Sequence, residues 1–268
     1  MARYGVLGWP VAHSRSPAMF AALGLPYQLL PVPPELFDET VRALGPAGFG
    51  GANVTIPHKE AALALADTAS ERARAIGAAN TLTFAGGAIA ADNTDAPGLI
   101  AALPFSAAGR SALVLGAGGS ARAAVWALTD AGASVQVWNR TPERARRLAA
   151  DLGAEAVTEA APADLLVNCT AVGLGNSSTD DLPGFKNLPV SPDDVGEFSC
   201  VVDLVYRSGG TDLERAARDR GIDTVDGLEV LVQQGALSYE AWTGRAPDRA
   251  AMSRAARDFD APPTATDT

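Results

Sequence analysis

The stretch that most constrains the fold is an apolar strand followed at once by a glycine-rich turn and a helical pattern, at residues 113–122 (LVLGAGGSAR). Its spacing, G-x-G-x-x-A, fits a turn that binds the pyrophosphate of a dinucleotide. Gly116 allows the tight turn, Gly118 lets the backbone approach a phosphate, and Ala121 permits close packing of the helix on the strand. The helix that follows aims its unpaired N–H groups at the phosphates. Glycine-rich turns also occur for structural reasons alone, so the residues that come next decide the interpretation.

The next expected strand ends in the sequence NRTPER, residues 139–144. An NAD site usually places a carboxylate about twenty residues after the first glycine, where it binds the ribose 2′-hydroxyl. Here the chain has Asn139 and Arg140 instead, with Arg144 one turn later. A carboxylate would repel a 2′-phosphate, whereas a guanidinium binds it through paired hydrogen bonds. The sequence therefore predicts NADP(H) as the cofactor.

Composition indicates a soluble enzyme that acts on small molecules. The chain has 268 residues, 47% of them hydrophobic and 19% charged, which fits two modest domains. Its formal net charge of −10 argues against nucleic acid and anionic membrane as partners. We find no signal peptide and no membrane span, and Cys169 and Cys200 have no metal-ligand spacing. We expect a cytoplasmic protein that needs no metal, and the sequence leaves open whether it forms a homodimer.

Apolar strand-like runs alternate with Ala- and Arg-rich helical patterns, which predicts an α/β protein with a parallel sheet covered by helices. The expected strands are residues 3–7, 27–32, 51–54, 81–84, 112–115, 134–138, 165–168 and 201–203. The expected helices are residues 17–23, 34–44, 59–65, 95–103, 120–131, 142–152, 212–220 and 227–243. Residues 103–110 read as a linker, and residues 175–196 as a surface loop with short helical turns.

Residues 8–17 (GWPVAHSRSP) resemble the opening G-x-P-x-x-H-S-x-S-P of shikimate dehydrogenases. Four further motifs follow in that family's order: residues 51–59 (GANVTIPHK), residues 92–95 (DNTD), the glycine-rich turn with residues 139–141, and residues 226–234 (DGLEVLVQQ). Together they extend over nearly the whole chain. Their joint order and spacing make the resemblance highly specific.

The resemblance implies NADPH-dependent reduction of 3-dehydroshikimate to shikimate, on the pathway to aromatic amino acids. It gives Lys59 the role of proton donor to the developing alkoxide, with Asp95 as its catalytic partner. The residues it implies for substrate binding are Ser14, Ser16, Thr55, Asn80, Asp95, Tyr206 and Gln234. The residues it implies for cofactor binding are Gly116, Ala117, Gly118, Gly119, Ser120, Asn139, Arg140, Thr141, Arg144, Leu204 and Gly227.

The implied organisation has an N-terminal domain for the substrate and a Rossmann-like domain for NADP. We expect residues 1–105 to form the substrate-binding domain and residues 106–233 the NADP-binding domain. Residues 234–260 would form a helical segment that packs back on the first domain, and residues 261–268 a disordered tail.

Several of these residues also have a plain structural interpretation. Ser16 before Pro17 fits a helix N-cap, Asp95 fits the cap of the helix that follows it, and a lone lysine such as Lys59 is usually a solvated surface charge. His13 and His58 read as structural or turn residues.

The chain departs from the family pattern at three places. Phe20 stands where a histidine is expected, Val230 replaces a methionine, and Tyr206 is followed by Arg-Ser-Gly instead of Asn-Pro. Two other functions stay open: a quinate or dual quinate/shikimate dehydrogenase, and a non-catalytic NADP-binding paralogue. The paralogue would have no reason to keep Lys59 together with Asp95.

Overall fold

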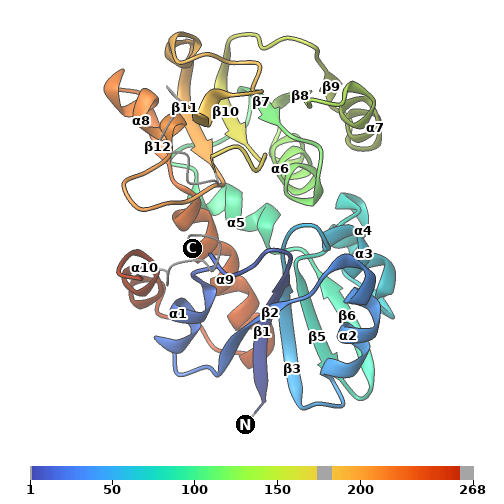
Figure 1. The fold of residues 1–268 in the computed structure, drawn as a ribbon. Coiled ribbons are helices and arrows are strands. Elements are labelled where there is room, and N and C mark those ends of the chain that lie inside the picture. The colour runs from blue at the N-terminus through green and yellow to red at the C-terminus, as the bar shows by residue number, and fades with distance from the viewer. Residues whose placement is uncertain (1, 174–182, 260–268) are drawn as a thin grey trace. The chain divides into compact units, whose positions relative to one another are not determined.

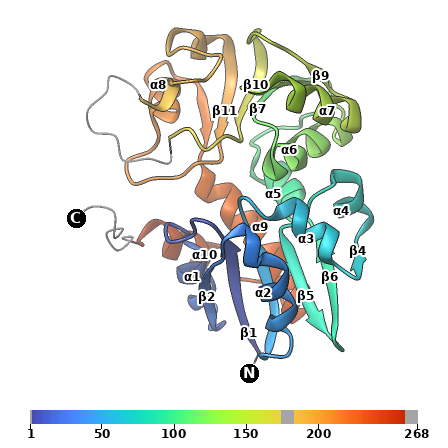
Figure 2. The same ribbon diagram turned by 45° about the vertical axis from the view of Figure 1, so that its right-hand side comes forward.

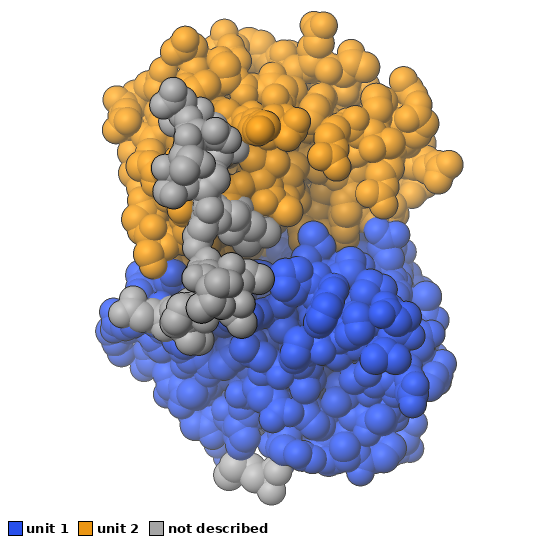
Figure 3. Space-filling view, viewed as in Figure 1, with its two compact units in different colours: residues 1–98, 231–268 blue, residues 99–230 orange. Residues whose placement is uncertain are grey.

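The computed structural model describes residues 2–173 and 183–259 of the chain and divides it into two units (Figure 1, Figure 3). Unit 1 consists of residues 1–98 and 231–268, and unit 2 of residues 99–230. Both divisions fall several residues before the boundaries expected from the sequence, because each lies inside a helix and no linker marks it. The helices concerned are α5 (Asp95–Ala102) and α9 (Gly227–Thr243). The predicted tail, residues 261–268, lies outside the described residues.

Unit 1 contains a six-stranded sheet in the order β2-β1-β3-β5-β6-β4. Its strands are β1 (Arg3–Gly8), β2 (Tyr27–Pro31), β3 (Phe49–Val54), β4 (Thr68–Ala69), β5 (Thr81–Ala85) and β6 (Ala88–Asp92). The first three run parallel, but β5 is antiparallel to both β3 and β6, so the sheet is mixed rather than parallel throughout. A tight turn at Gly86 and Gly87, with φ of 60° and 83°, joins β5 to β6.

The helices of unit 1 cover both faces of this sheet. They are α1 (Ser16–Ala21), α2 (Phe37–Leu44), α3 (Lys59–Leu65), α4 (Glu71–Ile76), α10 (Arg249–Arg257) and the parts of α5 and α9 in this unit. Successive strand residues point to opposite faces. Ala52 and Leu82 therefore pack with α2 and α3, whereas Gly51 lies against Trp242 of α9, with no room for a Cβ. Figure 2 shows α2 and α3 on one side of the sheet and α9 on the other.

Unit 2 contains a six-stranded, wholly parallel sheet in the order β12-β11-β10-β7-β8-β9. Its strands are β7 (Ser111–Leu115), β8 (Ser134–Trp138), β9 (Glu155–Ala156), β10 (Ala163–Asn168), β11 (Phe198–Asp203) and β12 (Asp223–Val225). Its helices include α6 (Gly119–Asp130), α7 (Pro142–Leu152) and α8 (Asp212–Asp219). Counted from β7, the strand order is 3-2-1-4-5-6, the Rossmann arrangement, whose ligand site lies where β7 and β10 diverge.

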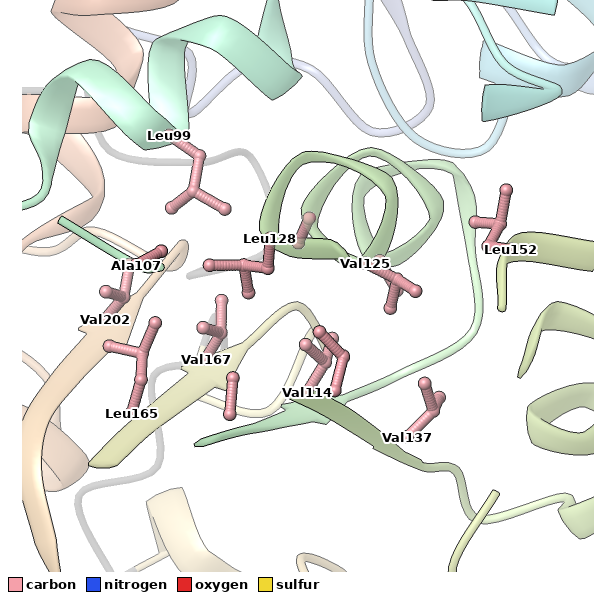
Figure 4. Packing of buried hydrophobic residues seen from close by; sticks show 14 of the residues in the cluster. Leu99, Ala107, Val114, Val125, Leu128, Val137, Leu152, Leu165, Val167 and Val202 are labelled. Atoms are coloured by element: carbon pink, nitrogen blue, oxygen red, sulfur yellow. The ribbon is translucent and has the colours of Figure 1, made fainter. Parts of the chain in front are cut away.

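Helices α6 and α7 cover one face of the unit 2 sheet and α8 covers the other. Figure 4 shows Val125 and Leu128 of α6 facing Val114 and Val167 of the sheet, all of them fully buried. The opposite core includes Phe185, Val190 and Val195.

The segment predicted as a surface loop therefore contributes three side chains to the core, although its polar residues Lys186, Asn187 and Asp193 are exposed. Its two short 3-10 helices, Pro183–Phe185 and Asp193–Glu197, agree with the helical turns expected there. Its apolar side chains are isolated between polar residues, so no periodic pattern marked them as core.

Leu128→Ala is expected to lower the free energy of unfolding by about 2–5 kcal/mol, because it leaves a cavity in a closely packed core. Leu36→Ala is the matched control: this side chain is 49% exposed, and its loss should cost less than about 0.5 kcal/mol. Urea unfolding of both variants measures the two effects. Equal losses would contradict the core assignment.

Candidate functional site

Lys59 and Asp95 form an ion pair at one edge of the unit 1 sheet. Lys59 is the first residue of α3 and Asp95 the first of α5, and Lys59 Nζ lies 2.7 Å from Asp95 Oδ2. The two side chains are only 10% and 19% exposed. A helix N-terminus favours the carboxylate and disfavours the ammonium group, so the Asp95 carboxylate offsets the unfavourable position of Lys59. Lys59 is therefore no solvated surface charge.

Asp95 is not the cap of its own helix. Asn93 Oδ1 accepts the hydrogen bond from the backbone N–H of Ala96 at 3.1 Å, and the Asp95 carboxylate turns to Lys59 and Asn80. The nearby Asp92 binds Ser70 and Arg72 instead.

Two amide side chains extend the pair into a chain of hydrogen bonds. Asn80 Nδ2 donates to Asp95 Oδ1 at 2.8 Å and to Gln234 Oε1 at 3.1 Å. Gln234 lies on α9, and its Nε2 donates to the carbonyl oxygen of Leu231 at 2.9 Å. Three residues from separate motifs, Lys59, Asp95 and Gln234, thus meet in unit 1. Asn80, which the resemblance also implies for substrate binding, joins Asp95 to Gln234.

The antiparallel hairpin explains why these residues meet. Thr81, at the start of β5, pairs with Asn53 near the carboxyl end of β3 and with Asp92 at the end of β6. The residues before β5 and after β6 therefore lie at the same sheet edge as those after β3. This edge is also the carboxyl end of β1, because β1 and β3 are parallel neighbours.

Ser14, Ser16 and Thr55 lie at the same carboxyl edge, after β1 and β3. Ser14 and Ser16 are buried, 6% and 3% exposed. Helix α1 begins at Ser16, its N-cap residue is Arg15, and no side chain caps it, so the N-cap interpretation of Ser16 is wrong. The sequence misplaced the helix start by one residue because Ser-Pro fits a cap and a first turn equally well.

In unit 2, the glycine-rich turn follows β7. It lies where the connections that leave the neighbouring strands β7 and β10 turn to opposite faces of the sheet. Gly116 has φ of +115°, and a Cβ there would lie 3.2 Å from the carbonyl oxygen of Cys169, just after β10. A Cβ on Gly118 would meet nothing within 4 Å, and α6 begins at the next residue. An open backbone at a helix N-terminus, where the helix dipole favours negative charge, fits the pyrophosphate of a dinucleotide.

The 2′-phosphate candidates lie beside this turn. Gly116 N donates to the carbonyl oxygen of Trp138 at 2.8 Å, and Trp138 ends β8. Asn139 Nδ2 donates to the carbonyl oxygen of Thr141 at 2.9 Å, which orders the residues before α7. Arg140 and Arg144 are both exposed at this corner.

Leu204 and Gly227 meet at the end of β11. A Cβ on Gly227 would lie 2.6 Å from the carbonyl oxygen of Leu204, so glycine is required for this close approach. Leu204 N donates to the carbonyl oxygen of Asn168 at 3.0 Å. Tyr206 follows in the same segment of unit 2 and is half-buried.

Two of the departures from the family pattern, Phe20 and Val230, are buried inside their own units. Phe20 is fully buried and stacks on Tyr27, with ring centroids 4.3 Å apart. Val230 belongs to the hydrophobic core between α6 and the sheet.

His58 is a structural residue, as the sequence indicated. It stacks on Phe37, its Nε2 lies 2.7 Å from the carbonyl oxygen of Val32, and burial lowers its pKa.

Sequence reasoning missed a buried acid, Asp203, at the end of β11. It is 1% exposed and accepts hydrogen bonds from Asn168 Nδ2, Val205 N and the Thr211 hydroxyl at 2.9, 3.1 and 2.7 Å. Burial raises the pKa of Asp203 to about 7, although these hydrogen bonds lower it. An aspartate that ends an apolar strand run is the sequence signal that could have found it.

Neither a metal cluster nor a membrane helix is found where the structure is described. In residues 2–173 and 183–259, no three His, Cys, Asp or Glu side chains are grouped as metal ligands. Within the same residues, no helix is both long and apolar enough to cross a bilayer.

Three family models match the chain in succession. The shikimate dehydrogenase substrate binding domain matches residues 6–82, shikimate / quinate 5-dehydrogenase matches residues 100–172, and the shikimate 5'-dehydrogenase C-terminal domain matches residues 227–257. A shikimate dehydrogenase (NADP(+)) of Thermus thermophilus is 46% identical over 267 residues, which cover 96% of this chain and 98% of the relative. The chain belongs to the shikimate dehydrogenase family.

Solved structures agree with this membership. Shikimate 5-dehydrogenase from a second strain of Thermus thermophilus, in complex with NADP(H) and shikimate, has a TM-score of 0.84 and 43% identity, covering 96% of this chain and 99% of that one. Ligand-free 5-ketofructose reductase of a Gluconobacter strain has a TM-score of 0.80 and 31% identity, covering 95% and 97%. The α/β class and the family predicted from the motifs are confirmed.

The raised pKa of Asp203 makes stability depend on pH. Its folded-state pKa of about 7 lies above the ordinary 3.8, so the folded protein is favoured while this carboxyl group is protonated. This contribution to the free energy of unfolding is fully present below pH 3.8 and is lost as the pH rises through about 7. Asp203→Asn cannot ionise at this position. Its free energy of unfolding should therefore rise, relative to that of the wild type, by roughly 1.4 kcal/mol per pH unit across this window.

Urea unfolding at pH 5, 6 and 7 measures this difference. Asp193→Asn is the control, because the Asp193 side chain is 97% exposed and should give a nearly constant difference. A constant difference for Asp203→Asn as well would show that the carboxyl group stays ionised in the folded protein.

Proposed function

We propose that this protein is an NADP-dependent shikimate dehydrogenase that reversibly reduces 3-dehydroshikimate to shikimate. The observation that carries the proposal is the hydrogen-bonded chain of Lys59, Asp95, Asn80 and Gln234, which joins a proton donor to polar groups suited to a polyhydroxylated ring. Family membership and the dinucleotide turn of unit 2 support it. A non-catalytic NADP-binding paralogue would not need this series of hydrogen bonds.

The cofactor-binding set lies at the carboxyl end of the unit 2 sheet. Gly116, Ala117, Gly118, Gly119 and Ser120 would hold the pyrophosphate, and Asn139, Arg140, Thr141 and Arg144 the 2′-phosphate. Leu204 and Gly227 complete the proposed set. NADPH, when bound, supplies the hydride that reduces the ketone carbon.

The side chains of unit 1 supply the remaining proton. The Lys59 ammonium group donates to the ketone oxygen as negative charge develops there, and the carbonyl becomes a hydroxyl group. Lys59 is left neutral and regains a proton from water. Asp95 holds the Lys59 ammonium group and accepts a hydrogen bond from a substrate hydroxyl, which fixes their mutual geometry. In the oxidative direction neutral Lys59 takes the hydroxyl proton.

The substrate carboxylate and hydroxyl groups need different partners. Ser14 and Ser16 offer buried hydroxyl donors for the carboxylate, and Thr55 lies at the same sheet edge. Asn80 and Gln234 each offer both donors and an acceptor, which suits neighbouring ring hydroxyls. Tyr206 is included in the substrate-binding set on the resemblance of its motif alone. Unit 1 would therefore serve the substrate and unit 2 the nucleotide.

One further expectation belongs to this proposal. The two cysteines, Cys169 and Cys200, are too few for a disulfide framework, which supports a reducing compartment, so we place the enzyme in the cytoplasm.

Substrate choice is tested directly by oxidation of NADPH. Parallel assays with 3-dehydroshikimate, 3-dehydroquinate and 5-ketofructose should show a dominant kcat/KM for the first. Comparable values for the first two would support the dual quinate/shikimate alternative. Inertness toward all three would contradict the proposal.

Lys59→Ala should lower kcat by roughly 10²–10⁴-fold, the usual range for general acid–base catalysis, with a far smaller change in substrate affinity. Adding Asp95→Ala should cost much less than the product of the two single effects, since the two side chains act as one unit. Steady-state kinetics measure both effects. Lys186→Ala is the matched control, because Lys186 is the chain's other lysine and is exposed. A folded Lys59→Ala protein with wild-type turnover would eliminate the mechanism.

Arg140→Ala should raise the KM for NADPH at least about tenfold, while kcat at saturating NADPH stays near wild type, because a charged hydrogen bond to the 2′-phosphate is lost. The KM for NADH, which has no 2′-phosphate, should change little. Arg146→Ala is the control, since Arg146 is exposed on α7 and pairs with Glu143. Parallel losses with NADPH and NADH would refute the 2′-phosphate assignment.

A further inference from the structure

Three buried hydroxyl groups meet behind the Asn80 amide in unit 1. The hydroxyl oxygens of Thr81, Thr94 and Ser238 lie 3.0 to 3.2 Å from one another, and each of these residues is at most 2% exposed. Thr81 begins β5, Thr94 precedes α5, and Ser238 lies on α9. This hydroxyl cluster, Thr81, Thr94 and Ser238, therefore joins the sheet to two helices that carry proposed site residues.

The backbone N–H of Thr94 fixes which way the Asn80 amide points, and the Thr81 hydroxyl donates to the same amide oxygen. The Thr94 hydroxyl also lies 3.0 Å from Asn80 Nδ2. Asn80 Oδ1 accepts from the backbone N–H of Thr94 at 2.7 Å and lies 3.1 Å from the hydroxyl oxygens of Thr81 and Thr94. With its oxygen held on this side, Asn80 directs Nδ2 at Asp95 and Gln234. Both of those partners present acceptor oxygens, so a flipped amide would set oxygen against oxygen.

Asn53 fixes the hydroxyl cluster from the sheet side. The Tyr27 hydroxyl donates to Asn53 Oδ1 at 2.8 Å, which turns Asn53 Nδ2 toward Ser238 Oγ at 2.8 Å and Thr81 Oγ1 at 3.2 Å. Because Asn53 donates to Ser238, the hydroxyl proton of Ser238 remains for an acceptor. The main-chain oxygen of Gln234, one helical turn earlier, lies 3.2 Å away. Ser238 thus bonds the sheet, the cluster and the turn of α9 that carries Gln234.

We propose that Ser238 is a positioning residue for substrate recognition, whose hydroxyl holds the Asn80 and Gln234 amides in the orientation that binds the ring hydroxyls. The inference rests on the proposed function of these two amides. Ser238 acts indirectly. Its hydroxyl contacts Asn53, Thr81, Thr94 and the Gln234 main chain, and the hydroxyls of Thr81 and Thr94 in turn contact the Asn80 amide. In a buried network, each fully satisfied group restricts the orientation of its neighbours.

Ser238→Ala removes one hydroxyl and leaves the helix otherwise unchanged. We expect the KM for shikimate to rise about tenfold, the effect of losing one well-placed hydrogen bond in recognition. The KM for NADP⁺ and kcat should each change by less than about twofold, because neither the nucleotide turn nor the proton donor is altered.

Thr243→Val is the matched control. The Thr243 hydroxyl donates to the carbonyl oxygen of Tyr239 at 2.7 Å, the same four-residue spacing on α9 as Ser238 and Gln234. The change therefore removes the same kind of helix bond, on a residue outside the hydroxyl cluster. Its KM for shikimate should stay at the wild-type value, even where its Tm falls as far as that of Ser238→Ala.

The dependence on Asn80 provides the decisive readout. In an Asn80→Ala background, the further change Ser238→Ala should alter the KM for shikimate by less than about twofold, because the amide that it orients is gone. Should Ser238→Ala fail to fold, Thr81→Val removes the hydroxyl that links Ser238 to Asn80 Oδ1, with the same expectations.

Two results would overturn the inference. One is a folded Ser238→Ala protein with a wild-type KM for shikimate, and the other is an undiminished effect in the Asn80→Ala background. Wild-type protein inert toward shikimate would instead contradict the proposed function, before any variant is compared.

Discussion

The ion pair between Lys59 and Asp95 is the interaction on which the proposed chemistry depends. Lys59 is largely buried at the N-terminus of a helix, where the helix dipole opposes its charge, so a carboxylate must lie beside it. Asp95 reaches it because the β5–β6 hairpin returns the chain to the carboxyl edge of β3. The antiparallel strand β5, which makes the sheet of unit 1 mixed, is thus the element whose turn back along the sheet brings Asp95 to Lys59.

The two units solve their binding problems by different means. Unit 2 would offer mainly backbone to the proposed nucleotide: Gly116 makes a turn at positive φ, Gly118 leaves the surface open, and α6 begins at the next residue. Unit 1 would rely on side chains from α3, α5 and α9 and on Asn80, which precedes β5, and buried hydrogen bonds join these side chains. A substitution in unit 1 can therefore alter recognition from a distance, whereas the phosphate turn depends chiefly on which residues are glycine.

Overall architecture alone does not separate this protein from enzymes with other substrates. A 5-ketofructose reductase shares the fold with a TM-score of 0.80, close to the 0.84 of a shikimate dehydrogenase. The distinction must lie in individual side chains, because one fold carries many chemistries. The groups that we propose as decisive are Lys59 with Asp95, the amides of Asn80 and Gln234, and the buried hydroxyls behind those amides.

The sequence by itself determined the features that depend on near neighbours along the chain. Gly116 and Gly118 indicated the dinucleotide turn, and Lys59 and Asp95 each belonged to a short motif at the start of an expected helix. Only the tertiary structure brought Ser238 to Asn53 and Thr81, across 185 and 157 positions. It also placed Val195 in the core and set the divisions of the chain inside α5 and α9. Local patterns specify elements, whereas pairing between distant elements follows from packing that no short segment encodes.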